Sequence, residues 1–212
     1  MVDWTGLAAI FAAFFIVAAS PGPATLAVSA VSAASGRKSG MNFGAGLALG
    51  LSFWGVVAAT GLGAALQASS QFLVALKVGG GLYLIWLAFG SGRSAIFTSS
   101  EKPKFDSPTS EREKAFFARG LALNLFNPKA VVAWMAALSV GLGGDDSVVS
   151  VGLATLGCAL IGFLTYAAYA AAFSLSAVRR GYEKFRRGVD GMVAALFAIA
   201  GVALIRSALT RT

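Results

Sequence analysis

The chain has 212 residues, of which 57% are apolar and 12% are charged, and its formal net charge is +8. A soluble domain carries about 25% charged residues, so this composition and its long uncharged stretches predict a polytopic helical membrane protein. The sequence has no histidine, which excludes histidine metal sites and histidine proton relays, and its one cysteine, Cys158, cannot form an internal disulfide. Lys and Arg gather between the apolar stretches, as in membrane proteins, so we expect no nucleic-acid partner.

The first apolar stretch runs from about Trp4 to Ala34 and contains Ser20-Pro21-Gly22-Pro23. At about 1.5 Å per residue, one straight helix of this length would exceed a hydrocarbon core of about 30 Å. Proline removes a backbone donor and clashes with the preceding turn of a helix. We therefore expect the stretch to kink, to split into two half-helices or to form a re-entrant segment.

The remaining apolar stretches predict five further spans, at about Gly40–Leu66, Phe72–Gly90, Ala115–Gly141, Val148–Val178 and Val189–Leu209. The first of these contains Gly46 and Gly50, whose spacing of four predicts close contact with another helix. The span from Ala115 contains a second proline break, Asn127-Pro128-Lys129.

Residues 91–114 are polar and predict a cytoplasmic linker between a first half, residues 1–90, and a second half, residues 115–212. The turns after spans one, three and five hold 13 of the 17 Lys and Arg residues, which predicts that these turns are cytoplasmic and that both termini face outward. Each half has three spans, so the two halves must be inverted relative to each other. The predicted fold is therefore all-α, with six transmembrane helices as two inverted three-helix repeats.

Matching features support the repeat. Pro23-Ala24 corresponds to Pro128-Lys129-Ala130, and Gly46-Leu47-Ala48 corresponds to Gly152-Leu153-Ala154, at a nearly constant offset. Chance similarity between Gly- and Ala-rich helices is the alternative. Inverted repeats with a broken helix in each half are a transporter plan in which one half rocks against the other.

The proline breaks are the candidate substrate site, because broken helices near the bilayer midplane mark such sites in transporters. Free N–H groups where each helix resumes, and the helix dipole, could hold a substrate carboxylate. Lys129 is the one charge deep within a predicted span, and such charges are usually functional. We expect Lys129 to pair with the substrate carboxylate or with the end of a half-helix, and snorkelling to an interface is the alternative. The candidate substrate-binding residues are Ser20, Pro21, Gly22, Pro23, Ala24, Asn124, Asn127, Pro128, Lys129 and Ala130.

Other polar residues in the spans have local roles as the favoured interpretation. Asn124 and Asn127 could bond the substrate, but we favour capping of the break. Asn42 and Thr60 are expected to bond a neighbouring helix.

Two residues are candidates for proton coupling, Lys129 and Asp190. No Asp or Glu lies in the middle of a predicted span, and Asp190 lies at the cytoplasmic start of the sixth span. Pairing of Asp190 with Arg186 or Arg187 is the favoured alternative for that residue.

Five motifs carry a family resemblance: Ser20-Pro21-Gly22-Pro23, Gly36-Arg37-Lys38-Ser39-Gly40, Gly46 with Gly50, Gly80-Gly81-Leu82-Tyr83-Leu84, and Gly120-Leu121-Ala122-Leu123-Asn124-Leu125-Phe126-Asn127-Pro128-Lys129-Ala130. In this order they resemble the LysE/RhtB family of amino-acid exporters over nearly the whole chain. The resemblance implies an exporter of amino acids or related small zwitterions in the bacterial inner membrane, driven by proton exchange.

The alternative function is a small-ion or metal permease or channel with the same inverted plan, although the spans lack acidic, Cys or His ligands suited to cations. A membrane enzyme would need a nucleophile with its base or a metal set, and the sequence shows neither. We therefore expect no catalytic residue, no metal site and no cofactor. A structural membrane protein would need neither proline break. The Gly-rich helix faces would suit a homodimer as well as internal packing.

Overall fold

The computed structural model describes residues 3–20, 22–60, 70–96, 110–141 and 148–209. All regular secondary structure within these ranges is helical, with no strand among them, as the composition predicts. The helices are α1 (Trp4–Ala19), α2 (Pro23–Ser35), α3 (Arg37–Ala59), α5 (Ser70–Ile96), α6 (Ser110–Leu125), α7 (Pro128–Gly141), α8 (Val148–Phe173) and α9 (Ser176–Leu209).

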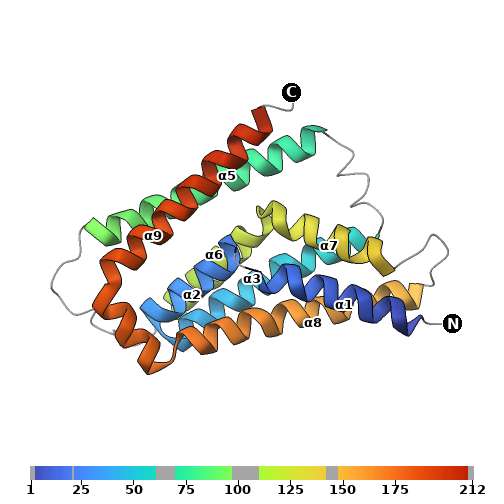
Figure 1. Cartoon of the computed structure of the whole chain (residues 1–212), viewed down its shortest axis with the longest axis horizontal. Coiled ribbons are helices and arrows are strands. Elements are labelled where there is room, and N and C mark those ends of the chain that lie inside the picture. The colour runs from blue at the N-terminus through green and yellow to red at the C-terminus, as the bar shows by residue number, and fades with distance from the viewer. Residues whose placement is uncertain (1–2, 21, 61–69, 97–109, 142–147, 210–212) are drawn as a thin grey trace.

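The helices form two groups (Figure 1). Helices α5 and α9 lie side by side as an inclined pair, and the other helices form the main bundle. The bundle core is centred on Trp134 of α7, whose ring lies 4.7 Å from that of Phe14 in α1 and whose indole N–H donates to Leu51 O of α3 at 2.7 Å. Cys158 of α8 is buried in the same core as a free thiol.

Three helical segments of the described ranges are long and apolar enough to cross a membrane, namely Arg37–Ala59, Val148–Phe173 and Asp190–Leu209. Helices α1 and α2 together make a fourth candidate, bent by 57° at the predicted proline break. The described part of the chain thus has three or four candidate membrane spans by this criterion, all of them helical. Helix α5 contributes a shorter apolar segment, Lys77–Gly90, and α6 opens with the charged residues Glu111, Arg112, Glu113 and Lys114.

Several helices extend further than the apolar stretches predict. Helix α9 begins at Ser176, so the basic cluster after the fifth stretch is helical, with a kink at Phe185 (φ −110°, ψ 16°). Helix α5 continues to Ile96 and α6 begins at Ser110, so both ends of the predicted linker are helical too. Hydropathy marks the end of an apolar stretch, but Arg, Lys and Glu favour helix and allow it to continue.

Helices α3 and α6 approach each other backbone to backbone. A Cβ on Gly46 would overlap the carbonyl oxygen of Phe117, and a Cβ on Gly120 would overlap that of Phe43. A Cβ on Gly50 would lie 2.9 Å from Leu121 O. The close helix contact predicted from Gly46 and Gly50 is confirmed.

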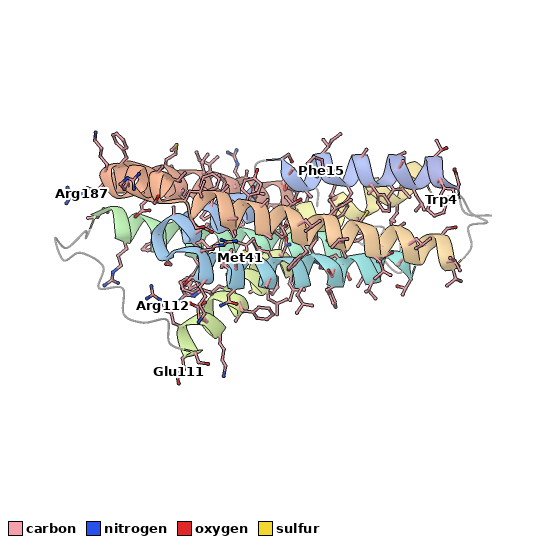
Figure 2. All side chains as sticks on the ribbon, turned by 90° about the horizontal axis from the view of Figure 1, so that it is seen from below. Trp4, Phe15, Met41, Glu111, Arg112 and Arg187 are labelled. Atoms are coloured by element: carbon pink, nitrogen blue, oxygen red, sulfur yellow. The ribbon has the colours of Figure 1, made fainter. Side chains whose placement is uncertain are left out.

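The helices of the second half run opposite to those of the first half at the same place in the order. Helices α6, α7, α8 and α9 run in the reverse direction to α1, α2, α3 and α5 (Figure 1). Arg112 and Arg187 lie towards one end of the molecule and Trp4 lies at the other (Figure 2).

Candidate functional site

The first break joins the end of α1 to the start of α2. Ser20 ends α1, and Gly22 precedes α2 in an extended conformation (φ −173°, ψ 179°). Pro23 takes the first helical position, where its missing N–H removes no hydrogen bond. The N–H of Gly22 donates to Thr25 Oγ1 at 2.9 Å, but no side chain caps the first turn of α2. Pro21 lies outside the described residues.

The second break joins α6 to α7 and is capped by Asn127. The Oδ1 atom of Asn127 accepts from the N–H of Lys129 at 3.1 Å, and its carbonyl accepts from the N–H of Ala130 at 2.9 Å. Pro128 takes the first position of α7. The predicted capping by Asn127 is confirmed, and the N–H groups of Lys129 and Ala130, where α7 begins, are occupied by the protein itself.

A buried hydrogen-bond network continues from Asn127 into the core. Asn127 donates to Asn124 Oδ1 at 3.2 Å. The amide of Asn124, which is fully buried, donates to Leu47 O at 2.7 Å and to the hydroxyl of Tyr166 at 3.1 Å. Asn124 therefore links α6 to α3 and α8 rather than capping a helix.

The two breaks meet through Lys129. Its Nζ donates to Ser20 O and to Ser20 Oγ, each at 2.8 Å. The ammonium thus lies at the C-terminal end of α1, where the helix dipole is negative. A Cβ on Gly22 would lie 3.0 Å from Nζ, so glycine at this position allows the close approach of Lys129. Of the two expected partners, the end of a half-helix is the one that Lys129 contacts here.

A cavity of about 20 Å³ lies between the two breaks. A water molecule needs at least about 10–15 Å³, so the cavity has room for about one water and not for an amino acid. It is lined by Phe14, Val17, Ala18, Gly22, Ala24, Thr25, Leu51, Asn124, Asn127, Lys129, Ala130, Ala133 and Tyr166. The arrangement is a small site with an ammonium, amide groups and hydroxyls in its wall.

Most of the predicted site residues gather at this cavity. Gly22, Ala24, Asn124, Asn127, Lys129 and Ala130 line it, and Ser20 is bound to Lys129. Pro23 and Pro128 line a smaller cavity of about 10 Å³ that shares Asn127 with the first. Asp190 is buried in α9 and is absent from the lining of either cavity. The substrate and coupling roles of all these residues stay predictions.

Sequence reasoning did not place Tyr166 or Glu113. Tyr166 lies inside an apolar span, where its hydroxyl was the available signal. Glu113 lies among other charged residues in the sequence, which gave no signal of its burial. It is nevertheless buried, and it accepts hydrogen bonds from Ser39 Oγ at 3.0 Å and from Asn42 Nδ2.

The two polar residues expected to bond a neighbouring helix differ in outcome. The bond from Asn42 to Glu113 confirms the prediction for Asn42, because it joins α3 to α6. Thr60 instead donates to Val57 O at 2.9 Å, within its own chain segment, so the prediction for Thr60 is wrong. Thr60 lies at the end of α3, where a free carbonyl is close at hand.

No group of three or more His, Cys, Asp or Glu side chains in the described ranges lies close enough to hold a metal ion.

Comparisons with known proteins match the chain to a translocator family and to bacterial membrane and efflux proteins. The model of the LysE type translocator family matches residues 15–208. The chain is 31% identical over 192 residues to the threonine efflux protein of Escherichia coli K12, covering 89% of this chain and 91% of that protein. It is 33% identical over 196 residues to the threonine efflux protein of Salmonella typhimurium, with the same coverage of 89% and 91%. It is also 29% identical over 198 residues to the uncharacterized membrane protein YahN of Escherichia coli K12, covering 93% and 88%. No solved structure matches the chain with significance.

Proposed function

The chain belongs to the LysE type translocator family, and from this premise we propose that it exports amino acids or related small metabolites. It is a membrane transporter and not an enzyme. The observation that carries the proposal is the meeting of the two helix breaks around a small, partly polar cavity. The threonine efflux proteins among its relatives make threonine the first substrate to test.

The proposed architecture is six spans in two inverted repeats, residues 1–90 and 115–212, with residues 91–114 as a cytoplasmic linker. The opposite directions of the helices in the two halves support it (Figure 1). Rocking of one repeat against the other would open the cavity to each side of the membrane in turn. Because the cavity is too small for an amino acid, loading requires such a movement.

In the proposed site, the substrate carboxylate lies at the first turn of α2. This turn has no side-chain cap, and Ala24 and Thr25 of this turn line the cavity. The corresponding turn of α7 is capped by Asn127 and has fewer donors to offer. The contact residues are those predicted from the sequence, Ser20 to Ala24, Asn124 and Asn127 to Ala130, with Pro21 included.

We propose proton exchange as the driving reaction, with Lys129 and Asp190 as the candidate coupling residues. Asp190 is buried, and Lys129 is partly buried in the cavity wall. The test is Lys129→Met. Full export driven by a pH gradient in this variant would remove Lys129 from the coupling mechanism.

We propose the bacterial inner membrane as the location, with both termini outside. The gathering of Arg112 and Arg187 towards one end of the molecule, away from Trp4, supports this orientation (Figure 2). A homodimer is a further proposal, supported by the Gly-rich helix faces, which allow close contact between helices. The mass of the purified particle in detergent, measured by light scattering, tests it, and a monomer mass would contradict it.

The proposed function is tested by efflux of labelled amino acids from proteoliposomes, with and without a pH gradient. We expect saturable efflux of at least one small amino acid, with threonine first, and faster efflux when protons can exchange. Efflux of none of the amino acids above that of empty liposomes would contradict the proposal, and flux of inorganic cations instead would favour the permease.

A further inference from the structure

We infer that the two oxygens of Ser20 are the binding site for the substrate's ammonium group, and that Lys129 occupies this site when the transporter is empty. The inference rests on the proposed function and adds the recognition chemistry of the ammonium group. On loading, the substrate ammonium takes the place of the lysine ammonium on Ser20. The released Lys129 then pairs with the substrate carboxylate.

The Ser20 oxygens form a built cation site. The hydroxyl of Ser20 donates to Val17 O at 2.8 Å, so its lone pairs are left to accept from the ammonium of Lys129. The backbone N–H of Ser20 donates to Ile16 O at 3.1 Å. This hydrogen bond holds the Ser20 carbonyl at the end of α1. Two acceptors at 2.8 Å and the negative end of a helix dipole select a positively charged N–H donor.

The neighbouring groups match the other half of a zwitterion. Beyond Ser20 and Gly22 comes the uncapped first turn of α2, which offers N–H groups and the positive end of a dipole. Hydrogen-bond acceptors, the Ser20 oxygens, therefore lie on one side of the first break, and N–H donors of α2 lie on the other side. An α-amino acid carries its ammonium and its carboxylate on the same carbon atom, so its two charged groups are held close together as well.

The position of Lys129 also explains why the volume of the cavity is small. Lys129 is part of the cavity wall, and its Nζ lies against Gly22. If Lys129 leaves Ser20, it frees the two oxygens and enlarges the cavity at the same place. A ligand without an ammonium group cannot replace the lysine and would leave the cavity too small for an amino acid.

The test uses the full chain in detergent, with Lys129→Ala and n-propylammonium as the probe. Propylammonium supplies the three carbons and the ammonium that this substitution removes. We expect Lys129→Ala to have a lower melting temperature than the wild type, and propylammonium to restore it in a saturable way. Tetramethylammonium has no N–H donor and should not restore it.

Lys77→Ala is the matched control. The ammonium of Lys77 lies 3.4 Å from Ser207 O in the α5–α9 pair, away from the cavity. Propylammonium should not stabilise Lys77→Ala. Adding Ser20→Ala to Lys129→Ala should weaken the propylammonium effect about tenfold, because one charge-assisted hydrogen bond is lost. Equal stabilisation of all these variants, or none of Lys129→Ala, would overturn the inference.

A second measurement applies if Lys129→Ala does not fold. In Lys129→Met, primary amines without a carboxylate should compete with threonine efflux, whereas in the wild type they should not compete. Suppose that threonine efflux is observed, but that propylammonium does not stabilise Lys129→Ala and primary amines do not compete in Lys129→Met. This result would contradict the ammonium site and would be consistent with the proposed function. Stabilisation of Lys129→Ala by propylammonium without any amino-acid efflux would contradict the proposed function but would still support a cation-binding site at Ser20.

Discussion

Two buried polar side chains, Glu113 and Asn124, have partners on other helices. Glu113 is 7% exposed and accepts from Ser39 and Asn42, and Asn124 is 0% exposed and bonds Leu47 and Tyr166. In lipid an unsatisfied polar group costs several kcal/mol, so such bonds fix how the helices pack. At the level of single residues, the polar network stabilises the fold as well as forming the site.

The first prediction concerns Glu113. Glu113→Ala leaves the donors of Ser39 and Asn42 without their partner, and we expect it to lower the free energy of unfolding by about 1–3 kcal/mol. Thermal unfolding in detergent is the measurement. Glu111→Ala removes an exposed carboxylate two residues before Glu113 in the same helix, so it is the control and should have little effect. Equal melting temperatures of the two variants would refute the role given to Glu113.

The second prediction concerns Gly22. Its backbone is extended and would accept any residue, so the glycine is needed for space and not for conformation. Gly22→Ala should fold but push Lys129 away from Ser20, because the new Cβ would lie 3.0 Å from Nζ. The same Cβ would crowd a substrate ammonium bound at Ser20, so we expect efflux to fall about tenfold, the effect of one weakened charge-assisted hydrogen bond. Gly191→Ala, with nothing within 4 Å of its Cβ, should leave efflux unchanged, and equal efflux in both variants would rule out this account.

At the scale of helices, proline and glycine patterns were the reliable signals. Pro23 and Pro128 predicted both breaks because proline constrains the backbone locally, whatever surrounds it. The outer ends of α5, α6 and α9 were missed because charge and hydropathy report burial, not helix length. The meeting of Lys129 with Ser20 depends on two helices far apart in the sequence, so local patterns could offer it only as one of several partners.

The third prediction tests the contact between α3 and α6. Gly120→Ala would force the helices apart, because its Cβ overlaps the backbone oxygen of Phe43, and we expect a loss of about 1–3 kcal/mol in stability. Gly152→Ala in α8 meets nothing within 4 Å, so it should keep or raise stability by up to about 1 kcal/mol through helix propensity. Thermal unfolding of both variants is the measurement. A stable Gly120→Ala protein would show that the two backbones are not in close contact.

At the scale of the whole molecule, the two helix breaks and the basic residues Arg112 and Arg187 lie in different parts of the structure. The breaks meet inside the main bundle, whereas Arg112 and Arg187 lie towards one end and Trp4 at the other (Figure 2). A membrane-spanning orientation of the bundle would place the cavity between two aqueous sides. Hydropathy predicted the membrane class, and the resemblance carried by the motifs predicted the family, because both depend on the sequence along its whole length.

The fourth prediction tests orientation with an impermeant thiol reagent on intact spheroplasts. Trp4 and Glu111 are exposed, and the native Cys158 is buried and should not react. Trp4→Cys should be labelled from outside, whereas Glu111→Cys should be labelled only after the membrane is broken. The reverse pattern would place the N-terminus in the cytoplasm.

The role of the cavity is tested most directly by filling it and measuring threonine efflux from proteoliposomes. Ala130 of α7 lines the cavity and is 3% exposed, whereas Val132 of the same helix is 57% exposed and faces away from it. With equal amounts of folded protein, Ala130→Leu should abolish saturable efflux and Val132→Leu should keep it at the wild-type level. Wild-type efflux with an unchanged KM in Ala130→Leu would show that the substrate does not pass between the two breaks.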